Sequence, residues 1–267
     1  MRSGRDTRLP EPVLSAELSV DYPQKKSVLR GARVDVFPGE ILGLVGQSGS
    51  GKSTLALAIL RLLDHTGASA SGRIVLLGRE LFGCTEAQMR EVRGRTLSLI
   101  PQSPAAALNP ALRIETQLRE VWTAHSRESW SSQTQRVVSL MAAAGLPNDD
   151  DFLRRFPKQI SVGQAQRILI VMALLHDPAL LIADEPTSAL DLITQREVLD
   201  LLAKFSAERH MSVLFISHDL LSVAALCHRL AILHEGTIVE CGPVKQVLSS
   251  PVHPYSKRLI DAVPRWQ

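Results

Sequence analysis

The sequence has few cysteines and no long apolar run, and both shortages exclude classes of protein. Cys84, Cys227 and Cys241 stand far apart and form no Cys-x-x-Cys pair. This spacing predicts reduced, cytoplasmic thiols rather than a zinc site or a disulfide framework. The apolar run 168–175 is much shorter than the roughly 20 residues that a membrane span needs. Any role at a membrane therefore requires a partner protein.

The sequence also has no strong excess of basic over acidic residues, with 30 lysines and arginines and 27 aspartates and glutamates. The formal net charge is +3, and the lysines and arginines do not gather in one block, so the sequence gives no reason to expect nucleic-acid binding. With 45% hydrophobic and 21% charged residues, the composition is that of a globular protein with one substantial core. Residues 1–8 are basic but no apolar segment follows them. We therefore expect no secretory signal and assign residues 1–12 to a tail.

What the sequence contains is an alternation of β-like and helical patterns, which indicates an α/β core. Residues 40–46 form a short apolar run that ends in glycine, which predicts a buried strand. Leu55, Ile59 and Leu62 follow at helical spacing, which predicts a helix over 53–63. A strand, a glycine-rich turn and a helix in this order are typical of a nucleotide-binding unit.

Longer and more polar helical patterns interrupt the alternation between residues 84 and 157. We interpret this stretch as a mostly helical lobe inserted into the core. The predicted elements are helices at 113–126 and 132–144, a strand at 96–100, a strand at 179–183, a helix at 194–209, a strand at 212–217 and a hairpin at 230–240 that turns at Glu235-Gly236. We predict a single domain, residues 13–267, with a core of 13–83 and 158–245, a helical subdomain of 84–157 and a C-terminal segment of 246–267.

Residues 46–54 match the P-loop pattern G-x-x-x-x-G-K-[ST]. Backbone N–H groups of such a loop close around phosphate oxygens, and the next helix adds the positive end of its dipole. We expect Lys52 at the β- and γ-phosphates and the Ser53 hydroxyl on Mg²⁺. The alternative is a glycine-rich turn with no ligand. The residues assigned to the nucleotide are Gly46, Gln47, Ser48, Gly49, Ser50, Gly51, Lys52, Ser53 and Thr54.

Two carboxylates follow the apolar run 179–183. An aspartate at the end of a buried strand can lie beside a P-loop and hold the coordination shell of Mg²⁺, so we assign Asp184 to the metal. Glu185 is then placed to orient or deprotonate an attacking water, because phosphoryl transfer depends mainly on positioning and charge stabilisation. The alternative for this pair is a strand exit with solvated charges.

These motifs, in this order, resemble those of the ATP-binding subunits of ABC transporters over nearly the whole chain. The resemblance implies a P-loop NTPase core of the RecA-like α/β class, with an antiparallel β subdomain and an inserted α-helical subdomain. It also implies ATP and Mg²⁺ as cofactors and ATP hydrolysis as the reaction. Tyr22 matches the aromatic residue that stacks on adenine. Gln102 matches the Q-loop glutamine, which in the family touches Mg²⁺ or the attacking water.

Three more residues are assigned by the same resemblance. Ser188 and Asp191 match the D-loop, which crosses the interface between two ATPase subunits. His218 matches the switch histidine that contacts the γ-phosphate. Taken singly, a tyrosine in a strand is more often core packing, and a histidine at a strand end is more often a surface residue. Their order along the chain favours the functional interpretation.

Residues 160–164 resemble the signature loop L-S-G-G-Q of this family, which binds the ATP held by the other subunit. Ser161, Val162, Gly163 and Gln164 are therefore assigned to the partner's ATP. Val162 stands where the pattern has glycine, and a β-branched residue is unfavourable where φ is positive or a ligand comes close. We predict that Val162 weakens the partner's site. A heterodimer with unequal ATP sites is thus favoured over a homodimer.

Two segments resemble the peptide and nickel importers within the family. Residues 102–110 end in Leu-Asn-Pro, and residues 251–264 contain His-Pro-Tyr. The lead-in to the signature, residues 153–159, resembles that of importers and not the Val-Gly-Glu-x-Gly loop that exporters usually carry. The resemblance implies a subunit that hydrolyses MgATP to drive uptake of peptides, nickel or a related small solute.

The partners implied are a second ATPase subunit, two transmembrane permease subunits and a solute-binding protein outside the membrane, with no nucleic acid. The implied location is the cytoplasmic face of the inner membrane. Another class stays open, namely a soluble ABC ATPase that acts on nucleic acid or ribosomes. Such proteins usually carry a coiled-coil insertion or two cassettes in one chain, and neither pattern is present in this sequence.

Overall fold

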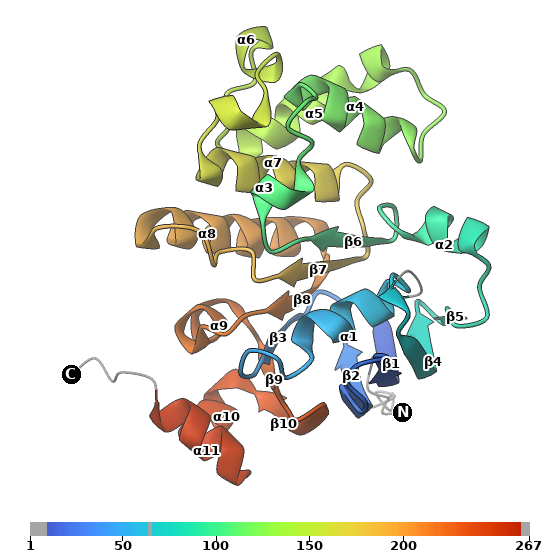
Figure 1. Cartoon of the computed structure of the whole chain (residues 1–267). Helices are drawn as coiled ribbons and strands as arrows, with labels where there is room; N and C mark the ends of the chain where they lie inside the picture. The colour runs from blue at the N-terminus through green and yellow to red at the C-terminus, as the bar shows by residue number, and fades with distance from the viewer. Residues whose placement is uncertain (1–9, 64–65, 263–267) are drawn as a thin grey trace, which may run out of the picture.

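Two β-sheets lie beside a lobe of helices in the computed structural model, which describes residues 10–63 and 66–262 (Figure 1). Residues 1–9 of the expected tail and the last five residues of the C-terminal segment lie outside the described residues. The helical lobe occupies the top of the view and the C-terminal helices the bottom.

The larger sheet has six strands in the order β10-β9-β3-β8-β7-β6. All neighbouring strands are parallel except the β9–β10 hairpin. These strands are β3 (Ile41–Val45), β6 (Leu97–Ile100), β7 (Leu180–Asp184), β8 (Ser212–Ile216), β9 (Arg229–His234) and β10 (Thr237–Pro243). The hairpin turns at Glu235 and Gly236, both with positive φ, as the sequence predicted.

The smaller sheet is antiparallel and has the order β2-β1-β4-β5. Its strands are β1 (Leu14–Asp21), β2 (Leu29–Val36), β4 (Ser69–Leu76) and β5 (Arg79–Glu80). Side chains of β1 alternate between buried and partly exposed because successive residues of a strand point to opposite faces. This is the expected antiparallel β subdomain.

The central parallel strands are buried on both faces. On β8, Val213 and Phe215 point to one hydrophobic cluster and Leu214 and Ile216 to the other. A strand covered on both sides is expected to be apolar throughout, which explains why these segments show no polar alternation. The first cluster packs under α7 and α8, and the second lies between the two sheets around α1.

The helices that cover the sheets and build the lobe are mostly short. They are α1 (Lys52–Ile59), α2 (Glu86–Val92), α3 (Pro104–Ala107), α4 (Ile114–Thr123), α5 (Trp130–Ala143), α6 (Asp150–Leu153), α7 (Val162–Leu174), α8 (Leu192–Arg209), α9 (Leu220–Leu226), α10 (Val244–Ser249) and α11 (Pro254–Asp261), with a 3₁₀ turn at Pro157–Gln159. No helix within residues 10–63 and 66–262 is long and apolar enough to cross a membrane.

One boundary of the predicted helical subdomain differs from the structure. The strand β6 lies inside the range 84–157, yet it pairs in parallel with β7 and forms the edge of the six-stranded sheet. Leu97 and Ile100 are fully buried in the two core clusters. The sequence predicted this strand but not its partner β7, which lies far along the chain, so the return to the core before the lobe was not recognised.

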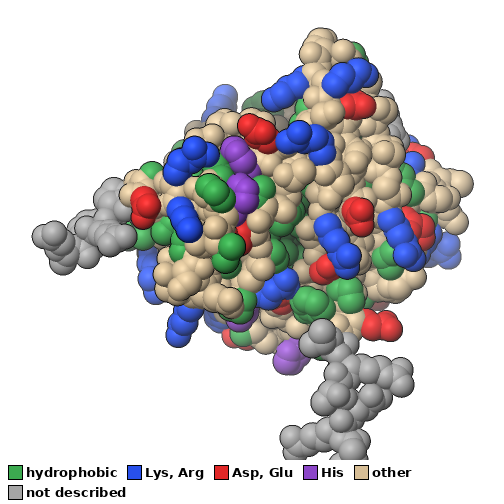
Figure 2. All heavy atoms as spheres, turned by 90° about the horizontal axis from the view of Figure 1, so that it is seen from below, with side chains coloured by type: hydrophobic (Ala, Val, Ile, Leu, Met, Phe, Trp, Pro, Cys, Tyr) green, Lys and Arg blue, Asp and Glu red, His purple; other side chains and the backbone are tan. Residues whose placement is uncertain are grey.

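Charged side chains of both signs are interspersed on the face seen from below (Figure 2). This distribution agrees with the small net charge of +3.

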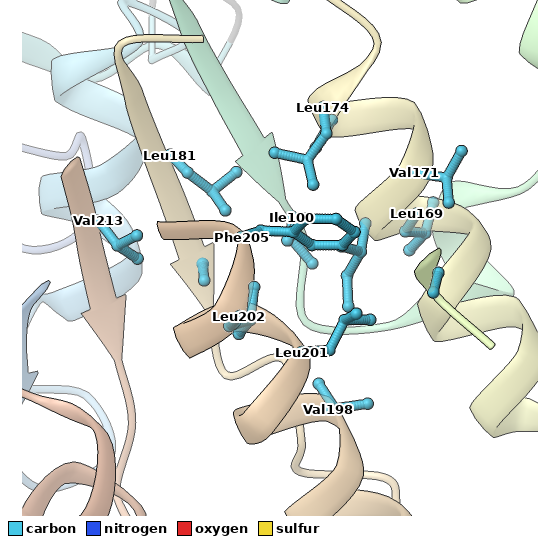
Figure 3. Close-up of a cluster of buried hydrophobic side chains, with 14 of the residues drawn as sticks. Ile100, Leu169, Val171, Leu174, Leu181, Val198, Leu201, Leu202, Phe205 and Val213 are labelled. Atoms are coloured by element: carbon cyan, nitrogen blue, oxygen red, sulfur yellow. The ribbon is translucent and has the colours of Figure 1, made fainter. Parts of the chain in front are cut away.

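Phe205 on α8 lies at the centre of the first cluster, beside Leu174 and Leu181 (Figure 3). It is 1% exposed. We expect Phe205→Ala to lower the free energy of unfolding by about 3–5 kcal/mol, because truncation leaves a cavity that the sheet and helices cannot fill. Urea denaturation measures this loss. The neighbouring exposed Lys204 supplies the control, and Lys204→Ala is expected to change stability by less than about 0.5 kcal/mol. Equal effects of both substitutions would contradict this packing.

Candidate functional site

The predicted nucleotide residues meet at one edge of the six-stranded sheet. The P-loop follows β3, Gln102 follows β6, Glu185 follows β7 and His218 follows β8. Because the carboxyl ends of parallel strands share one edge, four distant segments are brought together there. They line a cavity of about 630 Å³.

The P-loop has the local geometry of a phosphate-binding turn. Gly51 caps α1 with φ of 110°, a conformation that a residue with a side chain rarely adopts. The next residue, Lys52, is 6% exposed, and its ammonium donates to the backbone oxygens of Gly46 at 2.8 Å and Gln47 at 3.2 Å. The Lys52 side chain thus folds back onto the start of the loop and fixes its curved conformation.

Lys52 has a pKa below the ordinary lysine value, because burial disfavours the charged ammonium. The nearby carboxylates of Glu185 and Asp184 oppose this effect and favour the charge. A cation that is only partly compensated by these groups is well placed to attract a phosphate anion.

Asp184 and Ser53 form the part of the site that fits a hard cation. Burial raises the Asp184 pKa above its ordinary value, and the nearby Ser53 hydroxyl opposes this shift. The Oδ1 atom of Asp184 is buried and has no hydrogen-bond partner among the described residues. Oxygen donors of this kind suit Mg²⁺, which proteins commonly hold with one or two side chains together with substrate phosphates. The described residues contain no larger cluster of three or more metal-ligating side chains.

Glu185 is the focus of the polar contacts in the cavity. Its Oε2 atom accepts a hydrogen bond of 2.9 Å from the Gln102 amide and lies 3.3 Å from the His218 Nδ1 atom. The Glu185 backbone has φ of 47°. For a residue other than glycine this conformation costs on the order of 1 kcal/mol, and such strain concentrates at functional sites. The tight turn after β7 aims this carboxylate into the cavity.

Tyr22 closes another side of the same cavity. Its hydroxyl lies 3.4 Å from that of Thr54, so the ring stands beside the start of α1. A turn in which Tyr22 and Lys25 exchange backbone hydrogen bonds positions it. Lys25, which the sequence did not single out, also lines the cavity. Its position close to Tyr22, in the turn that follows β1, was the one feature of the sequence that could have pointed to Lys25.

The signature residues lie elsewhere. Ser161 caps α7, with its hydroxyl accepting from the Gln164 N–H at 3.1 Å and the Gln164 side chain accepting from the Ser161 N–H at 3.0 Å. Ser161, Val162, Gly163 and Gln164 line a separate cavity of about 510 Å³. This cavity shares no described lining residue with the one at the P-loop. One chain therefore does not bring its signature to its own P-loop.

Of the two conditions under which a valine is unfavourable in the signature loop, positive φ does not hold at Val162. Val162 is the first residue of α7 and is absent from the positive-φ positions, because the capping box of Ser161 and Gln164 starts a regular helix there. Its side chain is instead 52% exposed at the helix N-terminus. The sterically restricted position is Gly163, where an added Cβ would lie 2.7 Å from the Thr194 methyl group.

The D-loop residues connect the two cavities. The Ser188 N–H donates to the Glu185 carbonyl at 3.2 Å, whereas Asp191 lines the cavity of the signature. Asp191 also caps α8, and the hydrogen bonds from the backbone and hydroxyl of Thr194 lower its pKa. The next residues, Leu192 and Ile193, are 84% and 75% exposed. Exposed apolar residues beside two polar cavities are typical of a contact surface.

Comparison with known proteins agrees with this arrangement. Residues 29–188 match the family model described as ABC transporter. The chain is 39% identical over 260 residues to the peptidoglycan transport ATP-binding protein YejF of Agrobacterium fabrum, with 96% of this chain and 48% of that protein covered. It is 38% identical over 245 residues to the dipeptide transport ATP-binding protein DppD of Bacillus subtilis, covering 91% of this chain and 73% of the relative. The chain thus spans about half the length of the first relative.

Solved structures show the same fold. The dimeric ATP-binding cassette MJ0796, bound to ADP and Pi, superposes with a TM-score of 0.75. It is 22% identical in sequence, and the match covers 86% of this chain and 98% of that one. The predicted α/β fold with a P-loop core is confirmed. The chain therefore belongs to the ABC transporter family.

Proposed function

We propose that this chain hydrolyses MgATP and drives the uptake of peptides or a related small solute through partner permeases. The observation that carries this proposal is the convergence of Lys52, Gln102, Glu185 and His218 in one cavity at the edge of the parallel sheet. The names of the relatives, which include peptidoglycan and dipeptide transport proteins, support the solute class. Nickel, the other solute suggested by the sequence, has no such support.

Each site residue has its own proposed role in phosphoryl transfer. The P-loop and Lys52 bind the phosphates, and Tyr22 stacks on the adenine. Glu185 orients the attacking water and accepts its proton, while Gln102 and His218 fix the carboxylate from two sides at Oε2. Positioning of this kind supplies most of the rate in phosphoryl transfer. His218 also reaches the γ-phosphate.

Ser53 and Asp184 are the residues proposed to hold Mg²⁺, with Gln102 nearby. When bound, the ion neutralises charge on the phosphates. The unpartnered Oδ1 atom of Asp184 supports this assignment, since a buried carboxylate oxygen otherwise lacks compensation.

Asp184→Asn is therefore expected to abolish the gain in ATP affinity that Mg²⁺ gives, with little effect on binding in EDTA. Titration calorimetry with and without Mg²⁺ measures both, and an undiminished Mg²⁺ effect would contradict the assignment.

A second ATPase subunit is proposed to complete each ATP site, in a heterodimer favoured over a homodimer. The separation of the signature cavity from the P-loop cavity supports a partner that supplies its own signature. Two permeases and a solute-binding protein complete the transporter, with this chain on the cytoplasmic face of the inner membrane. The alternative, a soluble ATPase for nucleic acid or ribosomes, is not favoured by relatives named for transport.

We expect Glu185→Gln to retain ATP binding but to lower hydrolysis by about 10²–10⁴-fold, because the amide cannot accept the proton of the water. Phosphate release by the assembled complex and ATP affinity of the isolated chain measure the two effects. Glu208→Gln, an exposed change on α8, is the control and should behave like the unmodified protein. Unchanged hydrolysis, or lost binding, would count against the role of Glu185.

Val162 stands half-exposed at the N-terminus of α7, where its side chain would limit the approach of the partner's γ-phosphate. We expect Val162→Gly to raise hydrolysis at the partner's P-loop, with Val162→Ala intermediate because it removes two methyl groups and keeps the Cβ atom. A complex whose own-site hydrolysis is blocked by Glu185→Gln isolates this effect. If both variants match the parent complex, Val162 is a neutral variation and the sites are equivalent in this respect.

A further inference from the structure

The C-terminal His-Pro-Tyr segment reaches the P-loop, although the two motifs lie at opposite ends of the sequence. The Tyr255 hydroxyl accepts a hydrogen bond of 3.1 Å from the backbone N–H of Gln47, a residue 208 positions earlier. Gln47 is the second residue of the P-loop. A residue of the last described helix thus contacts the phosphate-binding loop directly.

Tyr255 is held in place by several contacts of its own. It is 4% exposed, and its ring stacks on that of His234 with centroids 3.7 Å apart and planes 12° from parallel. The ring of His253 accepts from the Tyr255 N–H at 3.1 Å and caps α11. The Glu240 carboxylate accepts from the backbone N–H groups of Val252 at 2.9 Å and His253 at 3.1 Å. The hydroxyl is therefore presented by a rigid support.

With this bond, both the backbone N–H and the backbone carbonyl of Gln47 have hydrogen-bond partners. On the carbonyl side, Gln47 accepts from the Lys52 ammonium at 3.2 Å and from the Ser50 N–H at 3.2 Å. On the amide side it donates to Tyr255. A phosphate that drew the Lys52 ammonium away would remove its bond to the Gln47 carbonyl. The Tyr255 bond does not depend on the lysine and still fixes the start of the loop.

We propose that Tyr255 is a positioning residue for nucleotide binding, which makes the C-terminal helix a functional part of the ATP site. It acts through the Gln47 peptide and does not line the nucleotide cavity. A loop already fixed in its binding geometry loses less conformational freedom when the phosphates arrive. The proposal rests on the P-loop being the nucleotide site and is independent of the transported solute.

The test is Tyr255→Phe, which removes the hydroxyl and keeps the ring that stacks on His234. We expect the Kd of the isolated chain for ADP, measured by titration calorimetry, to rise about fivefold, the usual weight of one hydrogen bond. In the assembled complex, KM for ATP should rise while kcat stays close to that of the unmodified protein. Lys257→Ala, an exposed change on the same helix, is the control and should leave both values unchanged.

Hydrogen exchange of the unmodified chain gives a second test that does not depend on a variant. The Gln47 amide should be protected without nucleotide and should lose that protection in Tyr255→Phe, while amides of the central strands β3 and β8 keep theirs. An unprotected Gln47 amide in the unmodified chain would overturn the proposal. So would wild-type ADP affinity in folded Tyr255→Phe. Loss of ADP binding by the unmodified chain would instead refute the nucleotide site itself.

Discussion

The constraint on which this structure depends is the shared edge of a parallel sheet. Strands β6, β7, β3 and β8 end side by side, so whatever follows each of them is delivered to one place. The residues at these strand ends are Gln102 after β6, Asp184 and Glu185 at the end of β7, the P-loop after β3 and His218 after β8. No contact between these segments is local in sequence. The apolar clusters on both faces of the sheet hold the strand ends in register and therefore also set distances within the site.

A second constraint is that one chain has two different polar cavities, one at the P-loop and one at the signature residues 161–164. The P-loop cavity is lined by Lys52, Ser53 and Glu185, whereas the signature cavity offers a helix N-terminus capped by Ser161. Between them runs the short segment from Ser188 to Asp191, whose backbone is bonded to Glu185 at one end and starts α8 at the other. This short segment therefore joins residues that belong to both cavities.

Much of this could be predicted from the sequence because the motifs report local chemistry. The P-loop glycines and the apolar run before Asp184 each specify a local structure, and the order of motifs placed them in one family. The strand at 96–100 was predicted, but its place in the core sheet was not, because that depends on its pairing with β7, which lies far along the chain. The backbone at Val162 was left open, although Ser161 and Gln164 have the spacing of a capping box, which starts a regular helix there. The Tyr255 contact joins the chain ends, and no local pattern encodes it.

The bond between Tyr255 and Gln47 also bears on the order in which the protein is made. A chain grows from its N-terminus, so the P-loop leaves the ribosome long before α11 does. Contacts of such large sequence separation form late because the intervening loop must first be closed. The cassette can thus assemble its parallel sheet during synthesis, and the bond from Gln47 to Tyr255 is added later, when α11 docks.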